Sequence, residues 1–363
     1  FRLYPNDSQV IMLNKTIGCS RLVYNHYLNE KQELYKNEHK SMSAYECIKD
    51  LKNLYVEYPF LKEVDSMSLR CSIFDLDNSF GKMFKEHTGY PKYKSKYDKN
   101  AYRTNFITSS YKGKVYENIK VDLINKTITL PKLKDIKIAG YRNLDKIDGR
   151  IINATVIKEK TGKYYVSVLY EQELEEKEFN PNNIVGIDVG VKDLVITSDG
   201  KKYVNNKAIL KYEKRIKRKQ KELARRVKGS NNYYKTKKQL AILYSKLANA
   251  RKYAMHEITK EITDNNDIIV TETLRVFNML KNHKLAKRIQ DASFGELIRQ
   301  LEYKAAWYSR TLIKIDTFYP SSQLCHVCGY QFKEVKKLSI RNWECPNCHT
   351  QHDRDTNAAI NIF

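Results

Sequence analysis

Hydrophobic residues recur at helical spacing in the first part of the chain, from about Ser8 to Lys85. Apolar side chains return about once per helical turn there, and glycine and proline are scarce. Examples are Leu13, Ile17, Leu22, Tyr24 and Leu28. Pro59 interrupts the pattern between Tyr58 and Phe60. The stretch therefore predicts helices that are joined by a loop near this proline.

The pattern changes from Gly89 onward, where short stretches of alternating apolar and polar residues replace the helical spacing. The segment NATVIKEKTGKYYVSVLYEQ alternates on both sides of Thr161-Gly162, which is typical of a hairpin of two strands. Residues 100–172 therefore predict a small antiparallel barrel or sandwich with a basic face. The polar stretch ELEEKEFNPNN that follows predicts a linker.

The last part of the chain alternates strands with helices. NIVGIDVGVKDLVITSDGKKYV predicts a buried strand, a second strand, a turn at Asp199-Gly200 and a third strand. Two charged helices follow, separated by Gly229-Ser230, and the second has an apolar stripe that begins at Leu240. DIIVTETL predicts a fourth strand, SFGELIRQLEYKAAWYSRTL a helix and LIKIDTF a fifth strand. This order predicts an α/β layout.

Charge indicates the kind of partner. The chain has 363 residues, enough for two or three domains, and 66 Lys and Arg against 42 Asp and Glu give a net charge of +24. Such an excess of positive charge usually indicates that the protein binds a polyanion. A membrane surface is the competing interpretation, but no apolar run approaches the ~20 residues of a membrane span, and no signal peptide opens the chain. Nucleic acid is the favoured partner.

The cysteines predict a metal site. There are seven, an odd number that does not resemble the disulfide framework of a secreted protein and favours a reducing compartment. Two CxxC pairs, Cys325/Cys328 and Cys345/Cys348, are separated by sixteen residues and offer four soft ligands, which suits a closed, structural Zn²⁺ site. The alternatives are two unrelated pairs or a redox dithiol, although a redox site needs only one pair. We expect the nearby His326, His349 and His352 to be surface bystanders rather than ligands.

Three acids stand at three distant positions that a single sheet would bring together. Asp188 lies in a strand of apolar residues and glycine, where an unpaired charge is costly to bury. Glu272 follows the DIIV strand, and Asp355 precedes a segment whose small Ala358 and Ala359 would let a helix pack tightly on a sheet.

Each acid also has an interpretation without a catalytic role. Asp188 could begin a turn at Gly190, Glu272 could be an exposed strand end, and Asp355 could be a helix N-cap. Taken together, an acid in the first strand, one after the fourth and one at the final helix is the layout of the RNase H-like fold. Clustered carboxylates bind Mg²⁺ or Mn²⁺, and two such ions activate water and stabilise the leaving oxygen of a phosphodiester.

The chain resembles the TnpB family, which are transposon-encoded RNA-guided nucleases related to the type V CRISPR effectors. The match extends over nearly the whole chain. It is carried by the segments FRLYPN, GYPKYKSK, LPKL, GIDVGVKDLVITSDG, TETL, MLKNHKLAKRIQDASFGELIRQLEYKAAWY, YPSSQLCHVCG and CPNCHTQHDRDTNAAINI. The resemblance implies a multidomain α+β protein. A helical recognition lobe is inserted in a small wedge β-barrel, and a RuvC-like (RNase H-like) α/β nuclease domain with an inserted zinc ribbon follows.

The implied domains have definite limits in this sequence. The wedge domain is expected at 1–7 and 89–178, the recognition lobe at 8–88, the nuclease domain at 179–319 and 350–363, and the zinc-bearing target-nucleic-acid-binding segment at 320–349. The resemblance also implies a guide RNA from the transposon end and a double-stranded DNA target beside a short transposon-adjacent motif, in support of transposon maintenance. We expect a cytoplasmic, nucleoid-associated prokaryotic protein that is a monomer rather than a dimer.

Residue by residue, Asp188, Glu272 and Asp355 match the family's catalytic acids, and the four late cysteines match its zinc ligands. One departure is Glu272-Thr273-Leu274, where many relatives have Glu-Asp-Leu; the acid itself is kept. Because all three acids are present, the chain is predicted to be active. Arg354 is the candidate for contacting a scissile or flanking phosphate. The alternative for Arg354 is an exposed side chain that pairs with Asp353.

Two basic segments are candidates for nucleic-acid contact. Lys207–Lys228 holds eleven Lys and Arg against two Glu, and the segment from Tyr90 to Arg103 interleaves tyrosines with cations, which suits unpaired bases. The alternatives are a solvated helix face for the first and barrel-edge aromatics for the second. The predicted contact residues are Tyr90, Lys92, Tyr93, Lys94, Lys96, Arg103, Lys214, Arg215, Arg218 and Arg225.

The main function predicted is RNA-guided cleavage of double-stranded DNA by two-metal-ion hydrolysis, with Mg²⁺ or Mn²⁺, structural Zn²⁺ and a guide RNA as cofactors. Two alternatives remain. One is a nuclease-inactive, RNA-guided DNA-binding repressor, which would bind without cutting. The other is an unguided RNase H-like nuclease or transposase, which would purify and cut without RNA.

Overall fold

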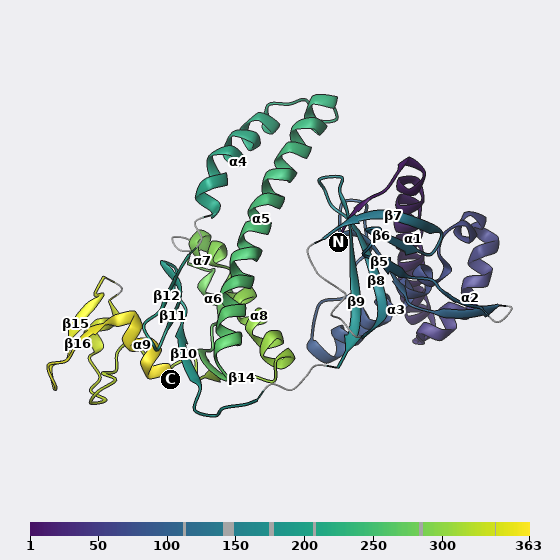
Figure 1. The fold of residues 1–363 in the computed structure, drawn as a ribbon. Coiled ribbons are helices and arrows are strands. Elements are labelled where there is room, and N and C mark those ends of the chain that lie inside the picture. Colours follow the sequence, from purple (N-terminus) through teal and green to yellow (C-terminus); the bar gives the residue numbers. More distant parts are fainter. Residues whose placement is uncertain (112–113, 141–148, 174–177, 206–207, 283–285, 338) are drawn as a thin grey trace. The chain divides into compact units, whose positions relative to one another are not determined.

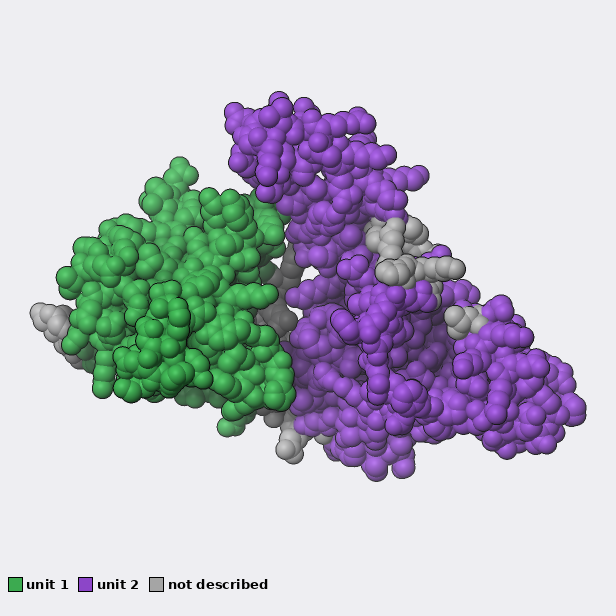
Figure 2. Space-filling model, turned by 180° about the vertical axis from the view of Figure 1, so that it is seen from behind, with its two compact units in different colours: residues 1–173 green, residues 174–363 purple. Residues whose placement is uncertain are grey.

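The computed structural model describes residues 1–111, 114–140, 149–173, 178–205, 208–282, 286–337 and 339–363. These residues form two compact units, Phe1–Glu173 and Leu174–Phe363, which Figure 2 shows in different colours (Figure 1, Figure 2). We call them unit 1 and unit 2 and describe each by itself. Residues 174–177 of the predicted linker, and Lys207 at the start of the basic run, lie outside the described residues.

Unit 1 begins with the predicted helices. They are α1 (Asp7–Glu38), α2 (Ala44–Glu57) and α3 (Ser66–Glu86), with the short 3-10 helix η1 (Pro59–Glu63) at the expected proline. The side chains of Asn6, Ser43 and Asp65 accept hydrogen bonds from the first amides of the three α-helices, which fixes where each begins. Apolar residues of all three pack into one core that includes Tyr27, Leu54 and Leu69.

The rest of unit 1 is an antiparallel sheet of seven strands in the order β2-β8-β9-β1-β7-β6-β5. Its strands are β1 (Arg2–Tyr4), β2 (Asn100–Asn105), β5 (Lys120–Asp122), β6 (Thr127–Leu130), β7 (Leu133–Ala139), β8 (Gly149–Lys158) and β9 (Tyr164–Gln172). A separate hairpin joins β3 (Thr108–Tyr111) to β4 (Lys114–Glu117). The β8–β9 hairpin is as predicted, and Gly162 has a φ of +82° at its turn.

Two features of this sheet bear on the predicted wedge domain. The three residues of β1 lie between β7 and β9, so the start of the chain completes a sheet whose other strands come after the helices. In the part of the chain that the structure describes, β2 and β5 each pair with only one strand of this sheet. The predicted barrel is therefore open, because its two edge strands do not pair with each other.

Unit 2 is built on a sheet of five strands in the order β12-β11-β10-β13-β14. The strands are β10 (Ile184–Asp188), β11 (Asp193–Thr197), β12 (Lys202–Val204), β13 (Ile268–Glu272) and β14 (Thr311–Ile315). β10 pairs in parallel with β13, and β13 pairs in parallel with β14. The first and fourth strands of this unit thus lie side by side, as the sequence predicts.

The helices of unit 2 are α4 (Ala208–Ala224), α5 (Asn231–Asn265), α6 (Val276–Met279), α7 (Ala286–Ala292), α8 (Phe294–Trp307) and α9 (Arg354–Ile362). α4 and α5 form the predicted charged pair, and Figure 1 shows them extending well beyond the sheet. α5 and α8 pack on one another and on the sheet through a core that includes Ile262, Phe294 and Leu297. None of the described helices is long and apolar enough to cross a membrane.

A small ribbon lies in sequence between β14 and α9. It contains the short 3-10 helix η3 (Lys333–Lys336) and a hairpin of β15 (Asn342–Glu344) and β16 (Gln351–Asp353). Cys325, Val335, Trp343 and Cys345 form its buried core. The core is too small to bury much apolar surface, so the ribbon depends on another source of stability.

Candidate metal centre

Asp188 and Glu272 emerge at the same edge of the unit 2 sheet. Asp188 is the last residue of β10, and Glu272 is the last residue of β13. The two strands are parallel and in register, with Ile187 opposite Thr271. The next residue of each strand is therefore one of the two acids, so the ladder itself places the carboxylates next to one another.

Helix α9 brings the third acid to this edge. Asp355 lies in its first turn, and the helix packs on β10, β11 and β13. Ala358 and Ala359 are 2% and 0% exposed, as expected for a helix that lies close against a sheet. The N-cap of α9 is Asp353, which accepts a hydrogen bond from the amide of Thr356. The interpretation of Asp355 as the N-cap is therefore wrong, and its carboxylate is not used for capping.

The three charges act on one another. Burial is the main cause, and the neighbouring charges of Glu272 and Asp355 add to it, so that together they raise the pKa of the Asp188 carboxyl from 3.8 to about 7. The nearby Arg354 partly opposes this increase in pKa. An excess of negative charge at a partly buried edge favours a bound cation. The structure thus brings the three predicted acids together, while their catalytic roles stay a prediction.

Two residues that the sequence analysis missed hold the carboxylates of Glu272 and Asp355. The hydroxyl of Ser321, which is 3% exposed, donates to Glu272 at 2.5 Å. The guanidinium of Arg341 lies 3.0 Å and 3.1 Å from the two carboxylate oxygens of Asp355. Among the described residues, the four late cysteines are the only group of three or more His, Cys, Asp or Glu whose ligand atoms all lie within 4.8 Å of one another. The three acids taken together are thus spaced more widely than the sulfurs, and the two donors hold the carboxylates of Glu272 and Asp355.

Arg354, the predicted phosphate contact, is not an exposed side chain. It is 9% exposed, at the start of α9, and its charge acts on Asp188. Asp353 pairs with Lys202 at 2.9 Å rather than with Arg354. The alternative of an exposed Arg354 paired with Asp353 is therefore wrong. The half-exposed cation at this edge is Arg341, whose side chain is 52% exposed.

The four late cysteines form the closed set of ligands that their spacing predicts. The sulfurs of Cys325 and Cys348 are 3.5 Å apart, and those of Cys328 and Cys345 are 3.6 Å apart. Gly329 has a φ of +71°, which gives the tight turn after the first pair. The hydroxyl and amide of Thr350 lower the pKa of the Cys348 thiol to about 6, which favours the thiolate that a metal ion needs. Four sulfur ligands in this arrangement fit Zn²⁺.

His352 corrects one expectation about the ribbon. His326 and His349 are exposed, but His352 is only 4% exposed and its Nε2 lies 3.1 Å from the Cys325 sulfur. It lies on β16 directly opposite Trp343 of β15, and both rings point into the ribbon core. His352 is thus a buried neighbour of a predicted zinc ligand, not a surface bystander.

The ribbon is fastened to α9 by two asparagines of that helix. The side-chain amides of Asn357 and Asn361 both donate to the carbonyl of Leu324 at 2.7 Å. The Asn357 oxygen also accepts a hydrogen bond from the amide of His326 at 3.2 Å. These bonds join the first cysteine pair to the helix that carries Asp355, so the positions of the sulfur cluster and of the third acid depend on each other.

The predicted contact residues of unit 2 are accessible. Lys214, Arg215 and Arg218 lie on α4, Arg225 follows it, and all four side chains are exposed. Within the described residues we find no acid in an ion pair with any of them, whereas Glu213 and Glu222 pair with other cations on or just after this helix. This surface therefore keeps an uncompensated positive charge, and contact with nucleic acid stays a prediction.

The predicted contact residues of unit 1 differ in accessibility. They are Tyr90, Lys92, Tyr93, Lys94, Lys96 and Arg103, and they lie after α3 or in β2. Lys92 and Lys96 are exposed, but the ring of Tyr90 packs edge to face on Phe80, and the hydroxyl of Tyr93 donates to Gln32 at 2.6 Å. Lys94 and Arg103 are partly buried and line a pocket that is described below.

Gly186 in β10 controls how closely α9 approaches the sheet. A Cβ atom on this residue would lie 2.3 Å from the carbonyl oxygen of Ala359 and 2.6 Å from the amide nitrogen of Phe363. We expect Gly186→Ala to lower the free energy of unfolding of unit 2 by about 1–3 kcal/mol, because backbone atoms of α9 must move. The urea midpoint of unfolding measures this change.

Gly81→Ala is the matched control. Gly81 lies inside α3, and a Cβ atom there meets nothing within 4 Å. This variant is expected to be stabilised by about 0.5–1 kcal/mol, since alanine is a better helix former than glycine. If Gly186→Ala were as stable as the unaltered chain, the close approach of α9 to β10 would be contradicted.

The raised pKa of Asp188 predicts a pH dependence of stability. Because the folded-state value is about 7 and the ordinary value is 3.8, the folded chain binds this proton more tightly than the unfolded chain. The associated stability is present below about pH 4 and is lost as the pH rises to 7. In magnesium-free buffer we expect Asp188→Asn, which cannot ionise, to gain stability relative to the unaltered chain over this interval. The gain should be on the order of 4 kcal/mol, since each pKa unit corresponds to about 1.4 kcal/mol.

Urea midpoints of the two proteins at several pH values measure that difference. It should grow between pH 4 and pH 7 and stay constant above, and added magnesium should reduce it by neutralising the carboxylates. A difference that does not change with pH would show that the carboxyl of Asp188 is not perturbed.

Three protein-family models match the chain. One described as "Cas12f1-like, TNB domain" matches residues 294–362, which include the ribbon and α9. One described as "Probable transposase" matches residues 167–283, and one described as "Helix-turn-helix domain" matches residues 1–40. In the structure, most of this last segment is the single continuous helix α1.

Two curated relatives match the whole chain. A protein of Streptomyces pristinaespiralis named "Putative RNA-guided DNA endonuclease" is 33% identical, over 100% of this chain and 87% of its own length. The Escherichia coli (strain K12) protein named "Putative RNA-guided DNA endonuclease InsQ" is 30% identical, over 100% of this chain and 90% of its own length. Among solved structures, the protein of a Cas12f1–sgRNA–target DNA complex has a TM-score of 0.61 at 16% identity, covering 98% of this chain and 82% of that chain.

The solved structure shows likeness of fold, and the curated relatives define a class of proteins named as RNA-guided DNA endonucleases. Each match spans the full length of this chain, so the similarity is not confined to one shared domain. The chain belongs to the TnpB family.

Proposed function

We propose that this DNA endonuclease is guided by RNA and cleaves double-stranded DNA beside a short transposon-adjacent motif by two-metal-ion hydrolysis. The single observation that supports this most strongly is the meeting of Asp188, Glu272 and Asp355 at one edge of the unit 2 sheet. The relatives named as RNA-guided DNA endonucleases support the same function.

The three acids fit a site for Mg²⁺ or Mn²⁺. They offer hard oxygen ligands, and the raised pKa of Asp188 reflects first its burial and then the negative charges of Glu272 and Asp355 beside it. Bound there, such ions supply an activated water and stabilise the leaving oxygen of a phosphodiester. Ser321 and Arg341 orient the carboxylates of Glu272 and Asp355, and they keep these side chains at the sheet edge.

Arg341 is better placed than Arg354 to contact a phosphate near this site. Its guanidinium is half-exposed and already lies beside Asp355, whereas Arg354 is buried. A guanidinium binds phosphate through planar, paired hydrogen bonds. We assign Arg354 instead to the electrostatics of Asp188, whose ionised form it favours.

The remaining parts of the chain receive the roles that the family resemblance implies. The open seven-stranded sheet with β1 is the wedge domain, the helices α1–α3 are the recognition lobe, and the sheet of unit 2 with its helices is the RuvC-like nuclease domain. The cysteine ribbon binds structural Zn²⁺ and, through Asn357 and Asn361, holds α9 in place. The exposed cations of α4 contact the backbone of the guide–target duplex.

Purification of the full chain from cells that carry its native element tests the guided function. We expect a defined RNA to copurify, and DNA cleavage to require both this RNA and Mg²⁺. Cleavage that is unchanged after RNase treatment would favour an unguided nuclease. RNA-dependent binding without cleavage in the presence of Mg²⁺ would favour the inactive repressor.

A further inference from the structure

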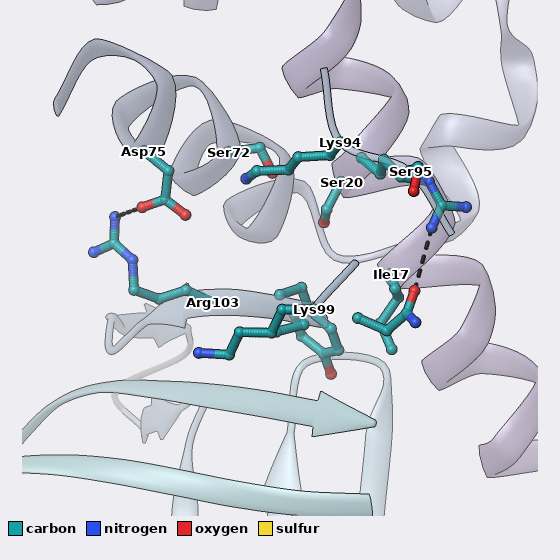
Figure 3. Close-up of a pocket in the computed structure, with 12 residues that line it drawn as sticks. Ile17, Ser20, Ser72, Asp75, Lys94, Ser95, Lys99 and Arg103 are labelled. Carbon is teal, nitrogen blue, oxygen red and sulfur yellow. Dashed lines mark hydrogen bonds and ion pairs between the residues drawn. The ribbon is translucent and has the colours of Figure 1, made fainter. Parts of the chain in front are cut away.

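A polar pocket in unit 1 lies far in sequence from the acidic centre, between α1, α3 and the start of β2 (Figure 3). Four cations line it, Arg21, Lys94, Lys99 and Arg103, whereas Asp75 is the single acid in its lining. Arg103 pairs with Asp75 at 2.8 Å, which uses the single negative charge. The pocket therefore keeps an excess of positive charge, and an anion is the ligand that would balance it.

Lys94 is the cation that most needs such a partner. Burial lowers the pKa of its ammonium, and the charge of Asp75 only partly opposes this. The ammonium lies 3.7 Å from the centre of the Tyr24 ring, and among the described residues no acid forms an ion pair with it. The backbone of Lys94 is fixed by hydrogen bonds to and from the side chain of Asn25, at 2.8 Å and 2.9 Å. These bonds fix the backbone of Lys94, whose side chain lines the pocket.

Ser20 gives an independent indication of a ligand. Its side chain lines the pocket, it is 4% exposed, and its hydroxyl is buried without a hydrogen-bond partner in the described structure. A buried hydroxyl without a partner costs free energy, so such a group calls for an explanation. Ser72 on the facing helix α3 is equally buried, but its hydroxyl donates to the carbonyl of Ser68 at 3.0 Å. Of these two hydroxyls, only that of Ser20 is available to donate a hydrogen bond to a ligand.

The size of the pocket limits what enters it. Its inner volume is about 20 Å³, close to the space of one water molecule. A nucleobase is far too large, whereas an oxygen of a phosphate group fits while the rest of the group stays at the mouth. Tyr90, Tyr93 and Tyr97 in the same segment are 45%, 50% and 69% exposed, and exposed rings of this kind suit unpaired bases next to a held backbone.

We propose that this pocket binds one phosphodiester of an unpaired RNA strand, with the Lys94 ammonium, the Arg21 guanidinium and the Ser20 hydroxyl as donors. The proposal rests on the proposed guided function, since that function supplies the RNA. The pocket would anchor the strand at one phosphate and thereby fix its register along the tyrosines. Lys94 would then contact RNA inside a defined pocket, rather than as one of many cations on a basic surface.

Binding of the copurifying RNA, transcribed in vitro, to the full chain in magnesium-free buffer tests the pocket. We expect Lys94→Met to weaken RNA binding about tenfold and to reduce the slope of log affinity against log salt by about 0.7. Ser20→Ala should weaken binding about tenfold with no change of slope, and its thermal stability should be unchanged or higher because an unpaired hydroxyl is removed.

Two control variants separate the pocket from general effects. Ser72→Ala removes a hydroxyl from the same pocket that is already paired, so RNA affinity should stay within about twofold although stability falls. Lys52→Met removes an exposed charge from α2, outside the pocket, and should also change affinity by less than about twofold. If Ser20→Ala bound RNA as tightly as Ser72→Ala, the proposed donor role would be refuted.

A scan of the RNA with single methylphosphonates, which neutralise one phosphate at a time, locates the ligand. Neutralising one position should cost the unaltered chain about tenfold in affinity and cost Lys94→Met clearly less, because that variant has already lost the Lys94 contact to the same phosphate. Weaker binding of duplex DNA but not of RNA by the pocket variants would overturn the assignment to RNA. An unaltered chain that retains no RNA would refute the guided function itself, whereas normal RNA binding by all variants would refute only the pocket.

Discussion

Replacing Asp188 with alanine is expected to reduce DNA cleavage at least roughly a thousandfold, while RNA and DNA binding survive. Burial and the charges of the other two acids raise the pKa of the Asp188 carboxyl to about 7, which marks it as the carboxyl most affected by the group. Removing it takes away one of the three proposed metal ligands. It also leaves the RNA-binding surfaces untouched, since these lie on other elements. Single-turnover cleavage and filter binding with the same guide RNA and target measure the two effects separately.

Glu302→Ala is a suitable control for Asp188→Ala. Glu302 is a half-exposed acid of α8 that pairs with Lys314 of β14, so it belongs to the same unit but not to the acidic centre. Its loss should leave cleavage within about twofold, because exposed ion pairs contribute little. Normal cleavage by Asp188→Ala would remove this residue from the metal site. Loss of RNA binding together with cleavage would point to a general structural defect instead.

Cys345→Ser is expected to remove zinc from the ribbon and to disable the nuclease unit. Cys345 is 0% exposed and belongs both to the sulfur cluster and to the small ribbon core. A ribbon with so small a core relies on the metal, and structural zinc sites contribute on the order of 10 kcal/mol to folding. Because Asn357 and Asn361 tie the ribbon to α9, we expect Asp355 to lose its position and cleavage to fall at least about a hundredfold.

Zinc content per chain, measured by atomic emission, and cleavage by the same preparation check this result. Cys71→Ser is the matched control, since Cys71 is equally buried but lies in α3 of unit 1, away from the cluster. That variant should keep its zinc and its cleavage even if unit 1 is somewhat less stable. Full zinc occupancy in Cys345→Ser would contradict the four-ligand site.

The order of elements was predictable because each has a strong local signal. The helices of unit 1, the hairpin around Gly162, and the succession of strands and helices in unit 2 follow from periodicity and turn residues. The meeting of Asp188 with Glu272 follows as well, since the pairing of the first and fourth strands depends on topology rather than on detail. The sequence could not show whether the sheet of unit 1 closes into a barrel or stays open. The alternation of apolar and polar residues in a strand does not reveal which strands pair at the edges.

The details of the acidic centre escaped the sequence analysis for a physical reason. β16 has only three residues, too few for an alternation that would show His352 inside and Asp353 outside. Where this strand turns directly into α9, Asp353 becomes the cap and Arg354 turns inward, and no periodicity spans that junction. Arg341 lies next to Asp355 because β15 pairs with β16. A prediction that the two segments on either side of CPNC pair as a hairpin would have placed Arg341 beside Asp355.

The three acids come from β10, β13 and α9, with long stretches of chain between them. Because the chain is synthesised in that order, the nascent protein holds the first two acids without the third only while residues 273–354 are made. On the proposed mechanism, cleavage cannot begin until the ribbon and α9 have folded. A product truncated before α9 is therefore expected to lack the third acid and to leave DNA uncut.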